Sequence, residues 1–108
     1  MERAGLTRMV KVEVVVDADD VGFVEQLFTA EGVTGWTGLT GISGAGHHGR
    51  HDGRLLFNER SGPTMLVAVL PRERLDGVVA GLTEHFTDHA GVMFVSETWV
   101  SRPEYFGD

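Results

Sequence analysis

Four segments of the chain have the pattern of β-strands. Residues 9–16, MVKVEVVV, alternate because Lys11 and Glu13 stand between valines, and a period of two is typical of a strand with one buried face. The segment 33–43, VTGWTGLTGIS, alternates more loosely and is weakened by glycine. Residues 64–70, TMLVAVL, are almost uniformly apolar, which predicts a central strand, and residues 91–100, GVMFVSETWV, predict a fourth strand.

Between these strands, two segments have the apolar spacing of amphipathic helices. The acidic residues of DADD, 17–20, suit the start of the first helix, where carboxylates cap amides and face the positive end of the helix dipole. Gly32 is placed to end it, since glycine tolerates the left-handed conformation. The second helix is expected to begin near Pro71, which also ends the third strand. The apolar stripes of the two helices are Val21, Val24, Leu27 and Phe28, and Leu75, Val78, Val79, Leu82 and Phe86.

The order of elements is therefore β-α-β, a long interruption, and β-α-β. This order predicts an α+β fold, the ferredoxin-like βαββαβ sandwich, in which both helices cover one face of an antiparallel four-stranded sheet. Each crossover joins strands that are not neighbours and is expected to be right-handed. The other face of the sheet is left uncovered, and the apolar content of the strands predicts that another subunit covers it.

Composition and charge narrow the classes of function. With 108 residues, 42% of them hydrophobic, the chain predicts one compact domain, 1–108, with a single core. The formal net charge is −7 and Lys11 is the only lysine, so nucleic acid is not expected as a partner. The absence of cysteine excludes disulfides and zinc–thiolate sites. The first 16 residues contain no apolar run of signal-peptide or membrane-span length, so we expect a cytoplasmic protein that is not inserted in a membrane.

A glycine-rich stretch, GISGAGHHGRHDGR, occupies residues 41–54 between the second and third predicted strands. In its GAG segment, 44–46, glycines allow consecutive amides to form a concave nest for an anion, although an ordinary glycine-rich turn has the same composition. Ala90 and Gly91 stand where the second helix meets the last strand. The backbone N–H groups of such a junction can reach a phosphate, or the junction can be an ordinary helix-to-strand turn.

Four arginines are candidate phosphate partners, because the guanidinium group pairs two phosphate oxygens at once in charge-assisted bonds of roughly 1.5–3 kcal/mol each. Any of them could also be a solvated surface residue. They are Arg50, Arg54, Arg60 and Arg102.

With these features in order, the sequence resembles the PII signalling superfamily, and more closely the PII-like regulators associated with bicarbonate transporters and carboxysomes. The resemblance rests on the first β-α-β half, on GAG leading into a long loop, on MLVAVL and on HFTDHAGVMFV, and it extends from Met9 to about Arg102. It implies a homotrimer with clefts between neighbouring subunits, each binding an adenine nucleotide. Residues 46–61 would form the T-loop that docks on a target protein, Thr87–Val92 the B-loop, and 101–108 the C-terminal loop that closes the cleft.

The resemblance also implies a set of ligand residues. The nucleotide-binding candidates are Thr37, Gly44, Ala45, Gly46, Arg50, Ala90, Gly91, Val92, Met93 and Arg102, and the bicarbonate candidates are Gly46, His48 and Arg50. Nitrogen-sensing PII proteins carry a lysine close after the B-loop glycine, where this chain has Val92 and Met93. Fewer cationic contacts favour ADP or AMP over ATP, with cyclic AMP as a further candidate.

Two features of that nitrogen-sensing branch are absent. That branch binds 2-oxoglutarate through a magnesium ion and a glutamine just past the loop-base glycines. In this chain the residues after those glycines are HHGR, with no glutamine. The nitrogen-sensing branch also modifies a loop tyrosine, whereas the only tyrosine here is Tyr105, in the tail. Both differences favour the carbon-related branch, with bicarbonate as a co-ligand and a bicarbonate transporter or carboxysome-linked protein as the target.

An alternative is a metal-binding ferredoxin-like protein that uses the loop histidines. Neutral imidazoles can ligate zinc or nickel, but a glycine-rich loop lacks the fixed geometry that helical i, i+4 spacing gives. The same side chains could be solvated, or could change charge near neutral pH. The residues concerned are His47, His48 and His51, followed by Asp52.

A third interpretation is a small enzyme with a site shared between subunits. No serine stands in a nucleophile-elbow context, so we expect no enzyme. His85 and His89 have the i, i+4 spacing but are expected to be surface residues. Trp36 and Trp99 are expected in the core or at a subunit interface.

Overall fold

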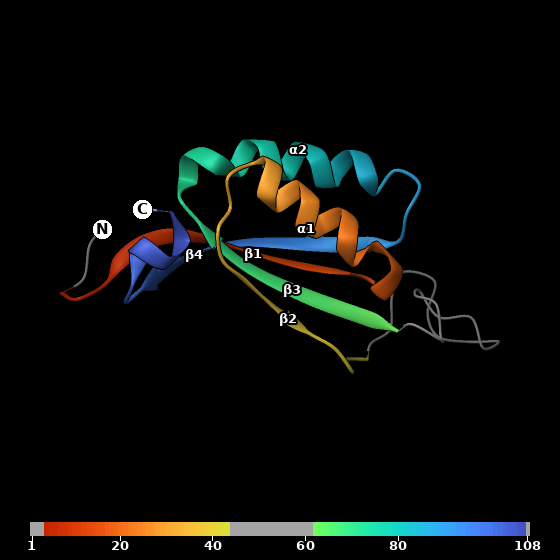
Figure 1. Ribbon diagram of the computed structural model, residues 1–108, viewed down its shortest axis with the longest axis horizontal. Coiled ribbons are helices and arrows are strands. Elements are labelled where there is room, and N and C mark those ends of the chain that lie inside the picture. Colours follow the sequence, from red (N-terminus) through yellow and green to blue (C-terminus); the bar gives the residue numbers. More distant parts are fainter. Residues whose placement is uncertain (1–3, 44–61, 108) are drawn as a thin grey trace.

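The computed structural model describes residues 4–43 and 62–107, and within these ranges the chain forms a sheet covered by two helices (Figure 1). In chain order the elements are β1 (Thr7–Asp17), η1 (Ala18–Asp20), α1 (Val21–Ala30), β2 (Trp36–Leu39), β3 (Pro63–Leu70), η2 (Arg72–Arg74), α2 (Leu75–His85), β4 (Gly91–Val100) and η3 (Pro103–Phe106). In the described ranges, no helix is both long and apolar enough to cross a bilayer.

The sheet has the order β2-β3-β1-β4, and each neighbouring pair is antiparallel. Both helices lie on the same face of this sheet (Figure 1). The prediction of a ferredoxin-like βαββαβ sandwich is therefore confirmed. The apolar third strand is interior, as its composition predicted, because β3 lies between β2 and β1.

The core lies between the helices and one face of the sheet. Alternate valines of β1, Val10 to Val16, are buried on this face, as are Leu66 and Leu70 of β3. From the helices, Phe28 of α1 and Leu82 of α2 are completely buried against them. The period-two and period-3.6 patterns of the sequence thus converge on one cluster.

The end of α1 follows the sequence prediction closely. Gly32 has φ +81°, the left-handed conformation. Its N–H donates to the carbonyl of Thr29 at 3.1 Å, and the N–H of Val33 donates to the carbonyl of Phe28 at 2.8 Å. These two bonds form a Schellman cap, which satisfies the last carbonyl groups of the helix.

Strand β2 is shorter than predicted, because only Trp36–Leu39 of the segment 33–43 pairs with β3. Gly35 precedes the paired residues and Gly41, with φ +73°, follows them. Glycine has no side chain to pack on the sheet and turns the backbone away from the extended conformation, so the strand stops early. Trp36 is half-buried and packs against Phe28, with ring centroids 5.4 Å apart.

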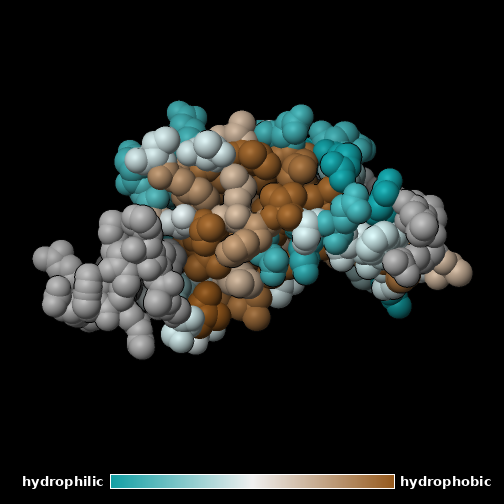
Figure 2. Space-filling view, turned by 180° about the vertical axis from the view of Figure 1, so that it is seen from behind, coloured by the Kyte–Doolittle hydropathy of each residue, from teal (hydrophilic) through white to brown (hydrophobic). Residues whose placement is uncertain are grey.

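The face of the sheet opposite the helices carries mostly apolar side chains. Strand register places on it Lys11, Glu13, Val15, Thr37, Leu39, Met65, Val67, Val69, Val92, Phe94, Ser96 and Thr98. Phe94 is 52% exposed, and Leu39 and Val92 are also exposed. Seen from behind, apolar side chains gather across the middle of the molecule (Figure 2). In the part of the chain that the structure describes, no helix or strand covers this face, as predicted.

The two glycines of α1 and its cap give a paired test of this fold. Gly32→Ala places a Cβ in the left-handed region and against the Arg74 side chain, so we expect the free energy of unfolding to fall by about 1–2 kcal/mol. Gly22→Ala adds a methyl group to a helix position with open space around it, so stability should rise by up to about 0.5 kcal/mol. Denaturant unfolding at one protein concentration measures the free energy of unfolding of both variants. If both substitutions changed it in the same direction, the left-handed cap at Gly32 would be contradicted.

Candidate functional site

The junction between α2 and β4 contains four of the predicted nucleotide residues. Ala90 ends the turn after α2, and Gly91, Val92 and Met93 begin β4 opposite the last residues of β1. Val92 is 40% exposed on the uncovered face of the sheet, whereas Met93 faces the helices and packs against the core. The structure therefore brings these four residues together, but the Val92 side chain and the backbone, not the Met93 side chain, face the surface.

Thr37 lies at the opposite edge of the sheet. It is exposed on β2 and pairs with Val67 of β3, while Val92 belongs to β4. Three strand spacings separate β2 from β4, about 14 Å in all. Within one chain, Thr37 and the α2–β4 junction therefore lie at opposite edges of the sheet.

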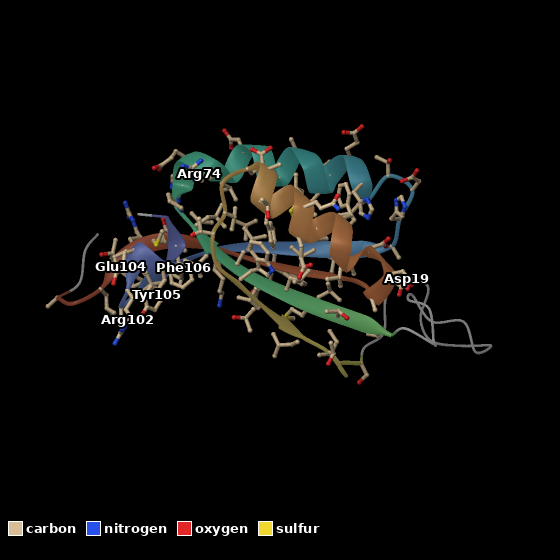
Figure 3. All side chains as sticks on the ribbon, in the orientation of Figure 1. Asp19, Arg74, Arg102, Glu104, Tyr105 and Phe106 are labelled. Carbon is tan, nitrogen blue, oxygen red and sulfur yellow. The ribbon has the colours of Figure 1, made fainter. Side chains whose placement is uncertain are left out.

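Arg102 lies at a third place, beyond the other end of β4. Its Nη1 donates a hydrogen bond to the hydroxyl of Tyr105 at 2.9 Å, and its guanidinium carbon lies 5.5 Å from the centre of that ring. Figure 3 shows this tail group at one end of the molecule, with Asp19 at the other. Since β4 has ten residues, its far end is roughly 30 Å from Gly91, and Arg102 follows just beyond that end.

The tail folds back onto the segment that joins α1 to β2. The hydroxyl of Thr34 donates to the carbonyl of Tyr105 at 3.2 Å. A Cβ at Gly35 would lie 3.0 Å from that same carbonyl oxygen and 3.1 Å from the Phe106 ring. The close approach of η3 therefore depends on glycine at position 35, and it holds the residues after Arg102 in a defined position.

The remaining predicted ligand residues belong to the long loop. They lie outside the described residues, together with the predicted T-loop range 46–61 and the loop histidines: Gly44, Ala45, Gly46, His47, His48, Arg50 and His51.

A groove of 530 Å³ runs between α1 and the edge strand β2, and it contains none of the predicted nucleotide residues. It is lined by Gly22, Glu25, Gln26, Thr29, Ala30 and Trp36. The indole N–H of Trp36 donates to a carboxylate oxygen of Glu25 at 3.4 Å across its wall. The groove is acidic at this point, which does not suit a phosphate.

Sequence reasoning was wrong about His85. Its side chain is only 7% exposed, stacked between Phe23 of α1 at 4.1 Å and His89 at 4.0 Å between ring centroids. The signal was present, since position 85 continues the spacing of the buried Val78 and Leu82 along one face of α2. His89, by contrast, is an exposed residue, as predicted.

Comparison with known proteins identifies the family. The family model for nitrogen regulatory protein P-II matches residues 9–105. Among solved structures, CPII from Thiomonas intermedia K12, a PII-like protein bound to ADP, AMP and bicarbonate, is similar at 34% sequence identity and a TM-score of 0.81, over 94% of this chain and 95% of that one. A second CPII structure, bound to ADP and bicarbonate, matches at 31% identity and a TM-score of 0.80, over 94% and 96% of the two chains.

More distant structures share the fold. A PII-like signalling protein from Thermus thermophilus is 18% identical, with a TM-score of 0.72 over 94% of this chain and 97% of that one. A comparison with curated proteins gave no match. The sheet order, the junction before β4 and the match over residues 9–105 agree: the chain belongs to the nitrogen regulatory protein P-II family, in its PII-like branch.

Proposed function

We propose that the protein is a homotrimeric PII-like regulator that binds ADP or AMP in clefts between subunits, with bicarbonate as a co-ligand. The observation that carries this proposal is the 34% identity, over 94% of the chain, to a PII-like protein whose structure holds ADP, AMP and bicarbonate. Residues 1–108 act as one domain in the cytoplasm. The arm at 46–61 docks on a target in inorganic-carbon metabolism, a bicarbonate transporter or a carboxysome-linked protein.

The positions of the ligand candidates support a site made by more than one copy. Thr37, the junction 90–93 and Arg102 lie at two opposite edges and at one far end of the same sheet. A nucleotide cannot contact all three in one chain. Assembly through the uncovered apolar face brings the edges of different subunits side by side, so that one cleft receives residues from two chains.

The chemistry of the junction suits a nucleotide with few phosphates. The described candidates include one cationic side chain, Arg102, while Ala90, Gly91 and Val92 offer backbone amides. Amides and a single guanidinium can neutralise a mono- or diphosphate more fully than a triphosphate, which carries additional charge. ADP and AMP are therefore preferred to ATP, and cyclic AMP, with its single phosphate charge, stays a further candidate.

In this proposal the protein regulates its target through the binding of the nucleotide and does not convert the nucleotide chemically. A bound nucleotide shifts the equilibrium between arm conformations only by the difference in its affinity for them. Bicarbonate at Gly46, His48 and Arg50 would add a second input at the base of the same arm. Because the two ligands then share one conformational equilibrium, each must change the affinity for the other by the same factor.

Calorimetric titration with ADP tests the proposed site and the carbon input together. In buffer stripped of carbon dioxide we expect saturable binding, and with added bicarbonate we expect a different affinity, because coupled ligands affect one another reciprocally. Equal ADP affinity in both buffers would contradict the proposed bicarbonate co-ligand but would agree with the nucleotide site. The absence of ADP and AMP binding in both buffers would overturn the proposal.

Arg102 supplies a test of the tail. Arg102→Ala removes a charge-assisted contact to phosphate and should weaken ADP binding on the order of 10- to 100-fold. Tyr105→Phe is the matched control, since it removes the hydroxyl that Arg102 contacts but retains both the guanidinium and the ring. Near-normal binding by the control separates a phosphate contact from loosening of the tail, and equal losses in the two variants would contradict a direct role for Arg102.

Phe94 supplies a test of assembly. Phe94→Glu places a carboxylate at the most exposed apolar side chain that strand register assigns to the uncovered face, and burying an unpaired charge at an apolar interface is strongly unfavourable. We expect the solution mass by light scattering to fall from three times the 11.8 kDa of one chain to that of a monomer. Thr83→Glu, which adds the same charge on the exposed side of α2, should remain a trimer. A trimeric Phe94→Glu variant would show that this face is not the interface.

A further inference from the structure

A cluster of three potential metal ligands lies where η1, the end of α2 and the turn before β4 meet. Among the described residues, Asp20, His85 and His89 each offer one ligand atom, and these atoms all lie within 4.8 Å of one another. None of the three residues belongs to the predicted loop 46–61, and the cluster is formed by other residues than the tail that carries Arg102. It includes no residue proposed to contact nucleotide.

The Nε2 atom of His85 is buried and has no hydrogen-bond partner within residues 4–43 and 62–107, although the ring is held between Phe23 and His89. A carboxylate oxygen of Asp20 lies 3.9 Å from it, too far for a hydrogen bond. A buried polar atom without a partner is costly, so an occupant between these two atoms would stabilise the arrangement.

The contacts of His89 leave its other nitrogen suited to a metal. The Nδ1 atom lies 2.7 Å from a carboxylate oxygen of Asp88 and 3.1 Å from the carbonyl oxygen of His85. Both neighbours are acceptors, so Nδ1 carries the proton, and in the neutral ring Nε2 carries the lone pair. A histidine that donates one N–H to a carboxylate and binds metal through its other nitrogen is a recurrent arrangement, which makes Asp88 a positioning residue.

Asp20 supplies the anionic ligand. It occupies the position before α1, yet its side chain makes no capping hydrogen bond to the helix. Its carboxylate is partly buried and points towards His85. With Asp88 beside His89, the cluster has two carboxylates around two imidazoles, a charge balance that favours a divalent cation.

We propose that Asp20, His85 and His89 bind a divalent transition-metal ion, with zinc as the ion best suited to them. Two imidazole nitrogens and one carboxylate oxygen, with water as a fourth ligand, form a common zinc donor set. Ligand atoms around a tetrahedral zinc with bonds of about 2.0–2.1 Å lie about 3.3 Å apart, so the cluster closes by movements on the order of 1 Å. Because the two imidazole rings are stacked with only 10° between their planes, their lone pairs do not converge, and binding requires the exposed His89 ring to rotate out of the stack.

Zinc titration tests the site in a protein whose loop histidines are replaced by His47→Asn, His48→Asn and His51→Asn. The hydrogen bond to the His85 carbonyl, with Asp88 beside it, raises the pKa of His89, so protons compete with metal. The titration is therefore run on the alkaline side of neutrality, at about pH 8, where fewer protons compete with the metal. We expect saturable binding of one zinc ion per chain, measured by competition with a chromogenic chelator, and a visible absorption band with cobalt as a substitute.

Three substitutions remove one ligand each: Asp20→Asn, His89→Ala and His85→Phe, the last of which retains a ring against Phe23. Each should weaken zinc binding more than about 10-fold. Asp19→Asn is the matched control, because it removes the same charge next to the cluster without removing a ligand, and it should change affinity less than about 3-fold.

No saturable zinc binding in the starting protein would overturn the proposal. So would affinity within about 3-fold of the starting protein in any of the three ligand variants, or equal losses in Asp19→Asn and Asp20→Asn. If His85→Phe fails to fold by circular dichroism, the variants His89→Ala and Asp20→Asn, which change less buried side chains, still decide the result.

Discussion

Strand β1 is paired on both sides, to β3 through residues 10–17 and to β4 through residues 7–16. From Val10 onwards its side chains alternate, so Val10, Val12, Val14 and Val16 all enter the core. A shift of one residue would carry Lys11 and Glu13 into the core and expose the valines, at a cost that no other contact could offset. The register of β1 therefore sets the positions of both its neighbours. Gly91 lies beside Val16 at one end of the sheet, and Val100 lies beside Thr7 at the other.

This register also separates the ligand candidates. Because β4 is aligned along nearly the whole of β1, the junction at 90–93 and Arg102 must lie at opposite ends of the sheet. Because β3 and β1 lie between β2 and β4, Thr37 must lie at the other edge. The same alternation that buries the even-numbered valines of β1 directs Val15, Phe94 and Val67 to the uncovered face. A rigid sheet of this kind can complete a shared site only by meeting another copy of itself.

The sequence predicted those features that depend on a repeating pattern. Period two in β1, the apolar run of β3 and the position of Gly32 each reflect forces within one element, and the structure confirms them. The length of β2 depends instead on where glycines interrupt pairing, and the docking of the tail on Gly35 depends on residues far apart in the sequence. For His85, helical spacing alone gave the direction of the side chain. Its neighbours Phe23 and Asp20 come from another part of the chain and are set by how α1 packs against α2.

The stack formed by Phe23, His85 and His89 gives the α2–β4 junction more order than its sequence predicts. It joins α1, the end of α2 and the turn that leads into β4. His89 is followed at once by Ala90 and Gly91, whose amides are proposed to contact phosphate. A ligand that tilts the His89 ring therefore acts on the backbone that would hold the nucleotide, through one intervening peptide. If both sites bind, metal and nucleotide act on a single short segment. The factor by which the metal changes the affinity for the nucleotide must then equal the factor by which the nucleotide changes the affinity for the metal.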